Sequence, residues 1–157
     1  EVYNDGLLVG YRYYDTENVP VLFPFGFGLS YAAFEYSDLN IEKVGETDFE
    51  VSYTITNASL VDAKEISQIY VKDAVSSVFK PEKELKAFEK VFIKAGESKK
   101  IIVNLNRKAL YNYDITSNSK YIENGEFIIM VGASSRDIRL KQKITVSLPA
   151  ETQYSVI

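Results

Sequence analysis

Strict alternation of apolar and polar residues constrains the fold of this chain more than any other feature. From Phe49 to Thr56 every odd-numbered residue is apolar and every even-numbered residue is polar. The run from Ile138 to Val146 repeats this spacing, with an interruption at Gln142. Because successive side chains of a strand point to opposite faces of a sheet, each run predicts a strand that is buried on one face.

Turn-forming residues such as Ala95-Gly96-Glu97-Ser98 and Asn124-Gly125 separate the alternating runs. The pattern predicts seven strands, at Phe34–Glu42, Phe49–Asn57, Glu65–Lys72, Leu85–Ile93, Lys99–Leu105, Glu126–Gly132 and Ile138–Ser147. A single helical turn is expected at Arg107–Tyr111, with Asn106 as its N-cap, crossing between two sheets. The expected fold is therefore all-β: a seven-stranded antiparallel sandwich of the immunoglobulin or fibronectin type III kind.

Composition excludes several classes of function. The 157 residues carry a net charge of −4 and contain neither His nor Cys, so Ser-His-Asp and Cys-His nucleophiles, thiolate or imidazole metal sites and disulfides are excluded. Without a dense Lys/Arg block, nucleic acid is not expected as a partner. No membrane span or signal peptide is visible, which predicts a soluble chain. The carboxylates Asp5, Asp15 and Asp114 are too scattered for a calcium loop, and we expect no metal and no cofactor.

The first 33 residues differ from the rest, because aromatic rings are interleaved there with Gly and Pro. This pattern favours extended chain and turns, and Gly26 and Gly28 permit backbone angles that other residues resist. Such a segment is too short to bury its own rings, which indicates a docking role. The candidate docking residues are Tyr11, Arg12, Tyr13, Tyr14, Phe23, Phe25 and Phe27.

Two predicted strands carry apolar residues on both faces. In one, Tyr70 lies opposite Ile69 and Val71; in the other, Met130 lies on the face opposite Ile129. A sandwich strand with one solvated face does not need this pattern. It predicts that the outer face of these strands is covered, either by another domain or by the aromatic N-terminal segment.

Several motifs resemble a known family. The strings Val9-Gly10-Tyr11-Arg12-Tyr13-Tyr14-Asp15 and Leu22-Phe23-Pro24-Phe25-Gly26-Phe27-Gly28-Leu29-Ser30-Tyr31 are similar to the C-terminal part of glycoside hydrolase family 3 β-glucosidases. Thr56-Asn57, Gln68-Ile69-Tyr70-Val71 and the run from Pro81 to Val91 follow in the expected order. The resemblance continues to Ser135 and fades after about Val146.

The resemblance implies a retaining enzyme in which a barrel supplies an Asp nucleophile, an α/β sandwich usually supplies the acid/base and a fibronectin-like domain follows. Residues 1–33 would be the tail of the α/β sandwich domain and a linker, 34–147 the fibronectin type III-like domain, and 148–157 a C-terminal tail or a linker. The family's nucleophile motif is Ser-Asp-aromatic, whereas Leu39 follows Ser37-Asp38 here. No catalytic or substrate-binding residue is therefore assigned to this chain. The expected partners are the barrel and the α/β sandwich domain, and the resemblance leaves a bacterial cytoplasmic or an exported enzyme open.

Two other functions are alternatives to that of a structural module. A carbohydrate-binding module could use Tyr111 and Tyr113, near Asn112 and Asp114, as stacking rings, although the chain lacks Trp. A free-standing interaction domain has no support beyond the fold. Asn57-Ala58-Ser59 matches a glycosylation acceptor, but Asn at the end of a strand favours a turn role.

Overall fold

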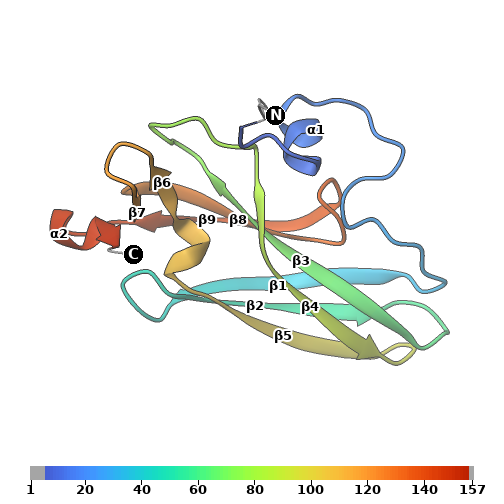
Figure 1. Ribbon diagram of the computed structural model, residues 1–157. Coiled ribbons are helices and arrows are strands. Elements are labelled where there is room, and N and C mark those ends of the chain that lie inside the picture. Colours follow the sequence, from blue (N-terminus) through green and yellow to red (C-terminus); the bar gives the residue numbers. More distant parts are fainter. Residues whose placement is uncertain (1–5, 156–157) are drawn as a thin grey trace.

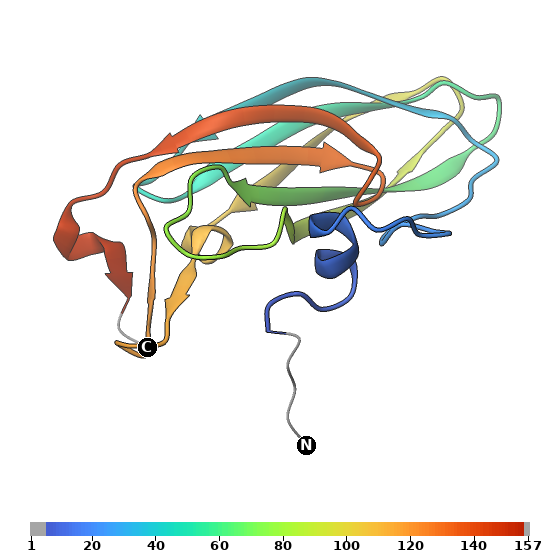
Figure 2. The same cartoon turned by 90° about the horizontal axis from the view of Figure 1, so that it is seen from above.

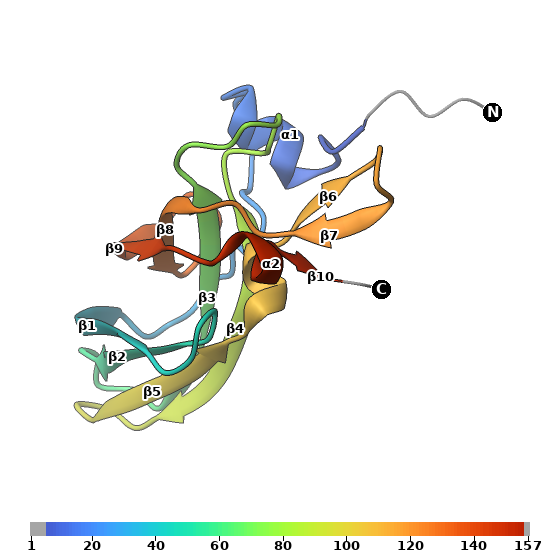
Figure 3. The same ribbon diagram turned by 90° about the vertical axis from the view of Figure 1, so that its left-hand side faces the viewer.

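Two antiparallel sheets face each other in the computed structural model, which describes residues 6–155 (Figure 1; Figure 3). The first sheet has the strand order β1-β2-β5, and the second has the order β4-β3-β8-β9. The strands are β1 (Phe34–Lys43), β2 (Phe49–Asn57), β3 (Ala63–Asp73), β4 (Glu84–Ile93), β5 (Ser98–Leu105), β8 (Gly125–Gly132) and β9 (Ile138–Val146). These are the seven predicted strands, and the predicted all-β sandwich is confirmed.

The alternating residues of β2 form the centre of the core. Val51, Tyr53 and Ile55 are fully buried between the sheets, and Ile69 of β3 and Ile129 of β8 belong to the same buried cluster. The Tyr53 hydroxyl shares a 2.7 Å hydrogen bond with the hydroxyl of Ser67, so the one polar atom of this ring is satisfied inside the core. The period-two pattern therefore marks the face that is buried.

A third, small sheet closes one end of the sandwich and was not predicted. It has the order β10-β7-β6 and consists of the short strands β6 (Asn112–Asp114), β7 (Ser119–Tyr121) and β10 (Tyr154–Ser155). Strands of two or three residues are too short to show an alternating pattern. The C-terminal segment contributes helix α2 (Ala150–Gln153) and β10, so the described part of the predicted tail is folded; Val156 and Ile157 lie outside the described residues.

The predicted helical turn is present as the 3-10 helix η1 (Arg107–Leu110). The side-chain oxygen of Asn106 accepts a hydrogen bond of 3.1 Å from the backbone N–H of Lys108, which confirms the predicted cap.

The N-terminal segment departs from the prediction of extended chain and turns, because it contains a short helix, α1 (Tyr11–Thr16). Gly10 precedes the helix with φ 59° and Asn18 follows it with φ 52°. These positive φ values, which most residues avoid, bracket the helix. Six residues are too few to show a helical period, so the pattern concealed this helix. Figure 2 shows α1 lying against the four-stranded sheet.

Among residues 6–155, no helix is long and apolar enough to cross a membrane. Nor do those residues include three or more metal-ligating side chains grouped so that they could hold an ion. Asp5, one of the scattered carboxylates, lies outside the described residues.

Candidate interdomain docking surface

The N-terminal segment packs on the outer face of the four-stranded sheet. Tyr70 of β3 and Met130 of β8 are register partners on this face, and both side chains are buried. The ring of Tyr11 meets Tyr70 edge-on at 6.2 Å between centroids and stacks on Phe25 at 4.4 Å. The sequence predicted that either another domain or the aromatic N-terminal segment covers this face. The structure shows the N-terminal segment there.

Close contact between Gly26 and Gln68 holds the second half of the segment. The Gln68 amide donates hydrogen bonds to the carbonyl oxygens of Gly26, at 3.1 Å, and of Ala133, at 2.8 Å, and its oxygen accepts one from the Tyr70 hydroxyl at 2.5 Å. Gly26 has φ 78°, and a Cβ atom there would lie 2.0 Å from the Gln68 side-chain oxygen. Both the backbone angle and the close approach require glycine at this position.

A buried carboxylate, Asp15, anchors α1 to the β8–β9 turn. Arg136 donates from Nε to Asp15 at 2.8 Å and from its guanidinium to the carbonyl oxygens of Tyr14, at 2.9 Å, and Val19, at 2.7 Å. The Lys83 ammonium lies 3.2 Å from the second oxygen of Asp15. Burial by itself would raise the pKa of Asp15, but the hydrogen bond from Arg136 and the nearby Lys83 ammonium hold that pKa below its ordinary value.

A second set of contacts fastens α1 to the start of β4. Arg12 forms an ion pair of 2.9 Å with Glu84, which also pairs with Lys86 at 3.0 Å. The backbone N–H of Leu85 donates to the Tyr11 hydroxyl at 2.8 Å. Burial alone would raise the pKa of Glu84, but Lys86 and Arg12 lower it. Arg12 thus pairs with a carboxylate of the sandwich and helps to fix the segment in place.

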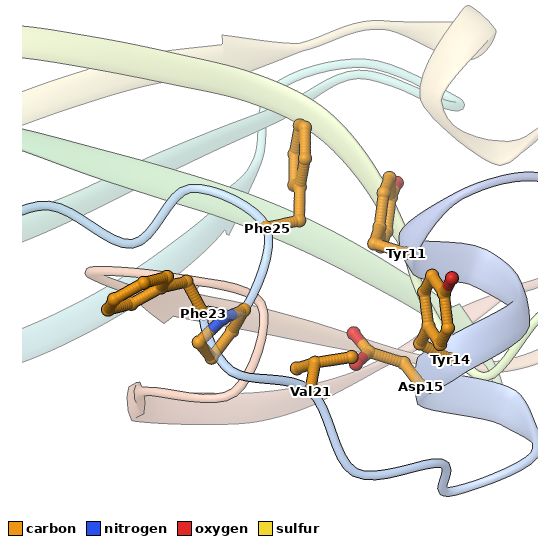
Figure 4. Close-up of a pocket in the computed structure, with 7 residues that line it drawn as sticks. Tyr11, Tyr14, Asp15, Val21, Phe23 and Phe25 are labelled. Carbon is orange, nitrogen blue, oxygen red and sulfur yellow. The ribbon is translucent and has the colours of Figure 1, made fainter.

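The opposite side of the segment exposes apolar surface. Tyr13, Tyr14, Phe25 and Phe27 each expose between 42% and 45% of their area, and Phe23 exposes 62%. Tyr14, Phe23 and Phe25 also line a pocket of about 210 Å³ together with Asp15 and Val21 (Figure 4). Three residues that the sequence reasoning did not single out are even more exposed: Leu22, Leu29 and Tyr31. We call these eight exposed residues the docking surface, after the role that the sequence predicts for the rings: Tyr13, Tyr14, Leu22, Phe23, Phe25, Phe27, Leu29 and Tyr31.

The residues that hold the docking surface in place were missed by the sequence reasoning. Gln68, Lys83, Glu84 and Arg136 lie between 42 and 122 positions from their partners in the segment. Isolated polar residues on separate elements carry no signal of such pairing. The strings that carry the family resemblance contain Asp15 and Gln68, and the run from Pro81 to Val91 contains Lys83 and Glu84, but the strings do not indicate which residues pair.

The candidate sugar-stacking rings lie at the third sheet, Tyr113 within β6 and Tyr111 directly before it. Arg107 lies 6.0 Å and Lys120 lies 5.8 Å from the ring centroid of Tyr111, so this ring already interacts with cations of its own chain. Tyr113 is half-exposed, and its hydroxyl donates to Asn118.

Asn57 of the sequon is fully buried at the end of β2. Its amide donates to the carbonyl oxygens of Val61, at 2.8 Å, and Ile93, at 3.1 Å. The turn role of Asn57 is thereby confirmed.

Comparison with known proteins places the fold in a family. Residues 65–135 match the family model of the fibronectin type III-like domain. The chain is 49% identical, over 92% of its length, to thermostable β-glucosidase B of Acetivibrio thermocellus. It is 44% identical, over 95% of its length, to an exo-α-(1→6)-L-arabinopyranosidase of Bifidobacterium breve. It spans about a fifth of the length of each of these relatives (20% and 19%).

A solved structure agrees with these relatives. The crystal structure of a Bifidobacterium adolescentis GH3 β-glucosidase superimposes with a TM-score of 0.88 and 43% identity, over 94% of this chain and 23% of that one. The match therefore includes the N-terminal segment as well as the sandwich. This chain belongs to the family of fibronectin type III-like domains that form part of glycoside hydrolase family 3 β-glucosidases.

Proposed function

We propose that this chain is a non-catalytic module of a family 3 β-glucosidase, which hydrolyses terminal β-D-glucosyl residues, and that its docking surface holds the catalytic domains in place. The partners in this proposal are the barrel and the α/β sandwich domain of the parent enzyme. Residues 1–33 connect to the α/β sandwich domain, 34–147 form the module, and 148–157 form a tail or a linker.

The observation that carries the proposal is the two-sided character of the N-terminal segment. Its inner side is fixed to the sandwich by Asp15, Arg12 and Gly26. Its outer side presents rings such as Phe23 and Tyr13 to solvent. A monomer gains nothing from holding apolar rings rigidly in water, whereas a partner binds such a preorganised surface at a lower entropic cost.

Burying the exposed rings would supply enough free energy to hold a tethered domain against the sandwich. Burying apolar surface contributes about 25 cal/mol per Å², so covering roughly 200 Å² of it contributes on the order of 5 kcal/mol before the costs of association. In one polypeptide the linker supplies an effective concentration of about millimolar, which removes much of the cost of bringing the domains together. Exposed rings of this number therefore suffice to dock a tethered domain.

The substrate proposed for the parent enzyme is inferred from the relatives of this chain. Both a β-glucosidase and an arabinopyranosidase carry a part that is more than 40% identical to this chain. A module that supports the catalytic domains without contacting the sugar is compatible with both activities. The β-glucosidase assignment follows the relative of 49% identity and the superimposed solved structure.

A hybrid enzyme tests the proposal. This chain replaces the matching fifth of A. thermocellus β-glucosidase B, and the hybrid is assayed on an aryl β-glucoside beside the isolated chain. We expect activity from the hybrid and none from the chain alone. The double variant Tyr13→Ser/Phe23→Ser should inactivate faster on heating than the unmodified hybrid. The control is Ile102→Ser, an exposed position on the other sheet. Activity of the chain alone, or equal inactivation of variant and control, would overturn the proposal.

A further inference from the structure

The side chain of Asn124, directly before β8, holds the C-terminal segment, by which we mean residues 148–155. The backbone N–H of Leu148 donates to the Asn124 side-chain oxygen at 2.7 Å, and the Asn124 amide donates to the Leu148 carbonyl oxygen at 2.9 Å. Leu148 is buried and belongs to the core cluster, and α2 and β10 follow it in the sequence. We call these two hydrogen bonds the latch, because they hold the first residue of the segment.

The residue that follows Asn124 makes this asparagine chemically labile. Asn124-Gly125 is the only Asn-Gly pair in the sequence. Asparagine is a thermolabile residue, because the backbone nitrogen of the next residue can attack its carboxamide carbon. Glycine obstructs this attack least, since it has no Cβ, and the space within 4 Å of an added Cβ at Gly125 is open. Asn124 is itself exposed, so water has access to it.

The reaction is a deamidation that consumes only water. The Gly125 nitrogen loses its proton to the solvent and forms a bond to the Asn124 carboxamide carbon. The carbon–nitrogen bond of the side-chain amide breaks, and ammonia leaves with a proton from the solvent. Water then opens the succinimide ring at either of its carbonyl carbons and leaves aspartate or isoaspartate. The overall exchange is water for ammonia, with no oxidation or reduction.

The latch opposes this reaction. To react, the carboxamide carbon must close to covalent distance of the Gly125 nitrogen, which pulls the group away from Leu148. Both polar atoms of the carboxamide are engaged by Leu148 in the folded chain. The reaction therefore requires the C-terminal segment to open locally, and its rate follows the population of the opened state.

From these observations we propose that Asn124 is a site of spontaneous deamidation, that the latch restrains the reaction, and that the modification loosens the C-terminal segment irreversibly. In aspartate an unprotonated oxygen replaces the amide donor, so two acceptors face each other between residue 124 and the carbonyl of Leu148. Isoaspartate lengthens the backbone directly before β8, whose register with β9 starts at the pair Gly125–Val146. Each product closes the latch less well than asparagine. The inference concerns the chain by itself and does not depend on the proposed function.

The first experiment measures the rate at Asn124 by peptide mass mapping of the chain incubated in warm, neutral buffer. We expect the folded chain to react at least about tenfold more slowly than the chain unfolded in guanidinium chloride. Equal rates would overturn the restraint by the latch. An unfolded chain that stays unmodified at Asn124 would overturn the site itself.

The second experiment weakens the segment while leaving Asn124 and Gly125 in place. Arg107 donates to the carbonyl oxygen of Thr152, and the Gln153 amide donates to that of Leu148 at 3.3 Å. The double variant Arg107→Ala/Gln153→Ala should raise the rate in the folded chain about tenfold, equivalent to about 1.4 kcal/mol. Hydrogen exchange of β2 checks that the sandwich stays folded, and Gln153→Ala alone replaces the double variant if it does not. An unchanged rate in a folded variant would overturn the restraint.

The third experiment tests the product. Asn124→Asp should raise hydrogen exchange of residues 148–155 about tenfold, since local opening sets the exchange rate. The matched control is Asn118→Asp, which adds the same charge in an exposed turn. Its side-chain oxygen still accepts from the Tyr113 hydroxyl, so exchange of the segment should stay within about twofold of the unmodified chain. Equal exchange in the two variants would overturn the loosening.

Discussion

Arg136 and Asp15, 121 residues apart in the sequence, form a charge-assisted hydrogen bond of 2.8 Å that fastens helix α1 to the β8–β9 turn. The same guanidinium holds two carbonyl oxygens of the N-terminal segment. One side chain of the sandwich thus fixes both ends of the stretch between Tyr14 and Val19. Exposed rings lie on either side of this stretch in the sequence, with Tyr13 before it and Phe23 after it.

Replacing Asp15 by Asn should loosen the segment. Asp15 exposes 3% of its side chain, and its loss as an anion leaves Arg136 and Lys83 without their counter-charge. We expect a cost of about 2 kcal/mol, since hydrogen bonds to charged groups contribute about 1.5–3 kcal/mol. Thermal unfolding and hydrogen exchange of residues 11–27 measure the effect. Glu126→Gln is the control, because it removes an exposed pair with Lys143 and should cost less than about 1 kcal/mol. Equal losses would contradict this account.

Acid should release the segment from the sheet. The folded pKa values of Asp15 and Glu84 lie below their ordinary values of 3.8 and 4.5. An acid with a depressed folded pKa stabilises the fold above its unfolded pKa and loses this contribution as pH falls through the folded value. We therefore expect the segment to stay bound at pH 7 and to become protease-sensitive as pH falls below about 4. In Asp15→Asn the part of this acid step that belongs to Asp15 should be missing. A transition of unchanged size in that variant would exclude Asp15 as a cause.

Gly26→Ala should weaken the second half of the segment. The new Cβ would collide with the Gln68 side chain, which is buried and holds three hydrogen bonds, and alanine disfavours φ 78°. We expect a loss of about 2 kcal/mol, from backbone strain and displaced hydrogen bonds. Gly28→Ala is the matched control, because nothing lies within 4 Å of its added Cβ. Urea unfolding of both variants would show the difference, and similar midpoints would refute it.

The sequon at Asn57 should stay unmodified in a glycosylating host. Its amide is buried and donates to Val61 and Ile93, so an attached glycan would replace one of the two donating hydrogens and would have no room in the fold. Intact mass measurement of the secreted chain should show no added hexose, and a glycosylated, folded product would contradict this. Asn57→Ala should also destabilise the fold by about 2 kcal/mol, because two carbonyl oxygens lose their donor. Ser59→Ala removes the sequon as well but leaves these two bonds, and should cost less.

The sequence predicted the sandwich well because the patterns that mark strands and helix caps are local. Alternation from Phe49 to Thr56 marks which face of β2 is buried, and Asn106 marks the start of η1. The pattern of Tyr70 against Ile69 also predicted a covered outer face. Each of these depends on residues only a few positions apart, where side-chain period and capping chemistry act.

By itself, the sequence determined the all-β fold, the aromatic character of residues 11–27 and the family of the chain. Tertiary structure alone decided which rings are buried and which face solvent, because that depends on contacts between residues distant in sequence, such as Gln68 with Gly26 and Arg136 with Asp15. The small third sheet likewise depends on contacts between residues distant in sequence. Two-residue and three-residue strands are stabilised by the neighbours they meet in space, and no local pattern encodes those neighbours.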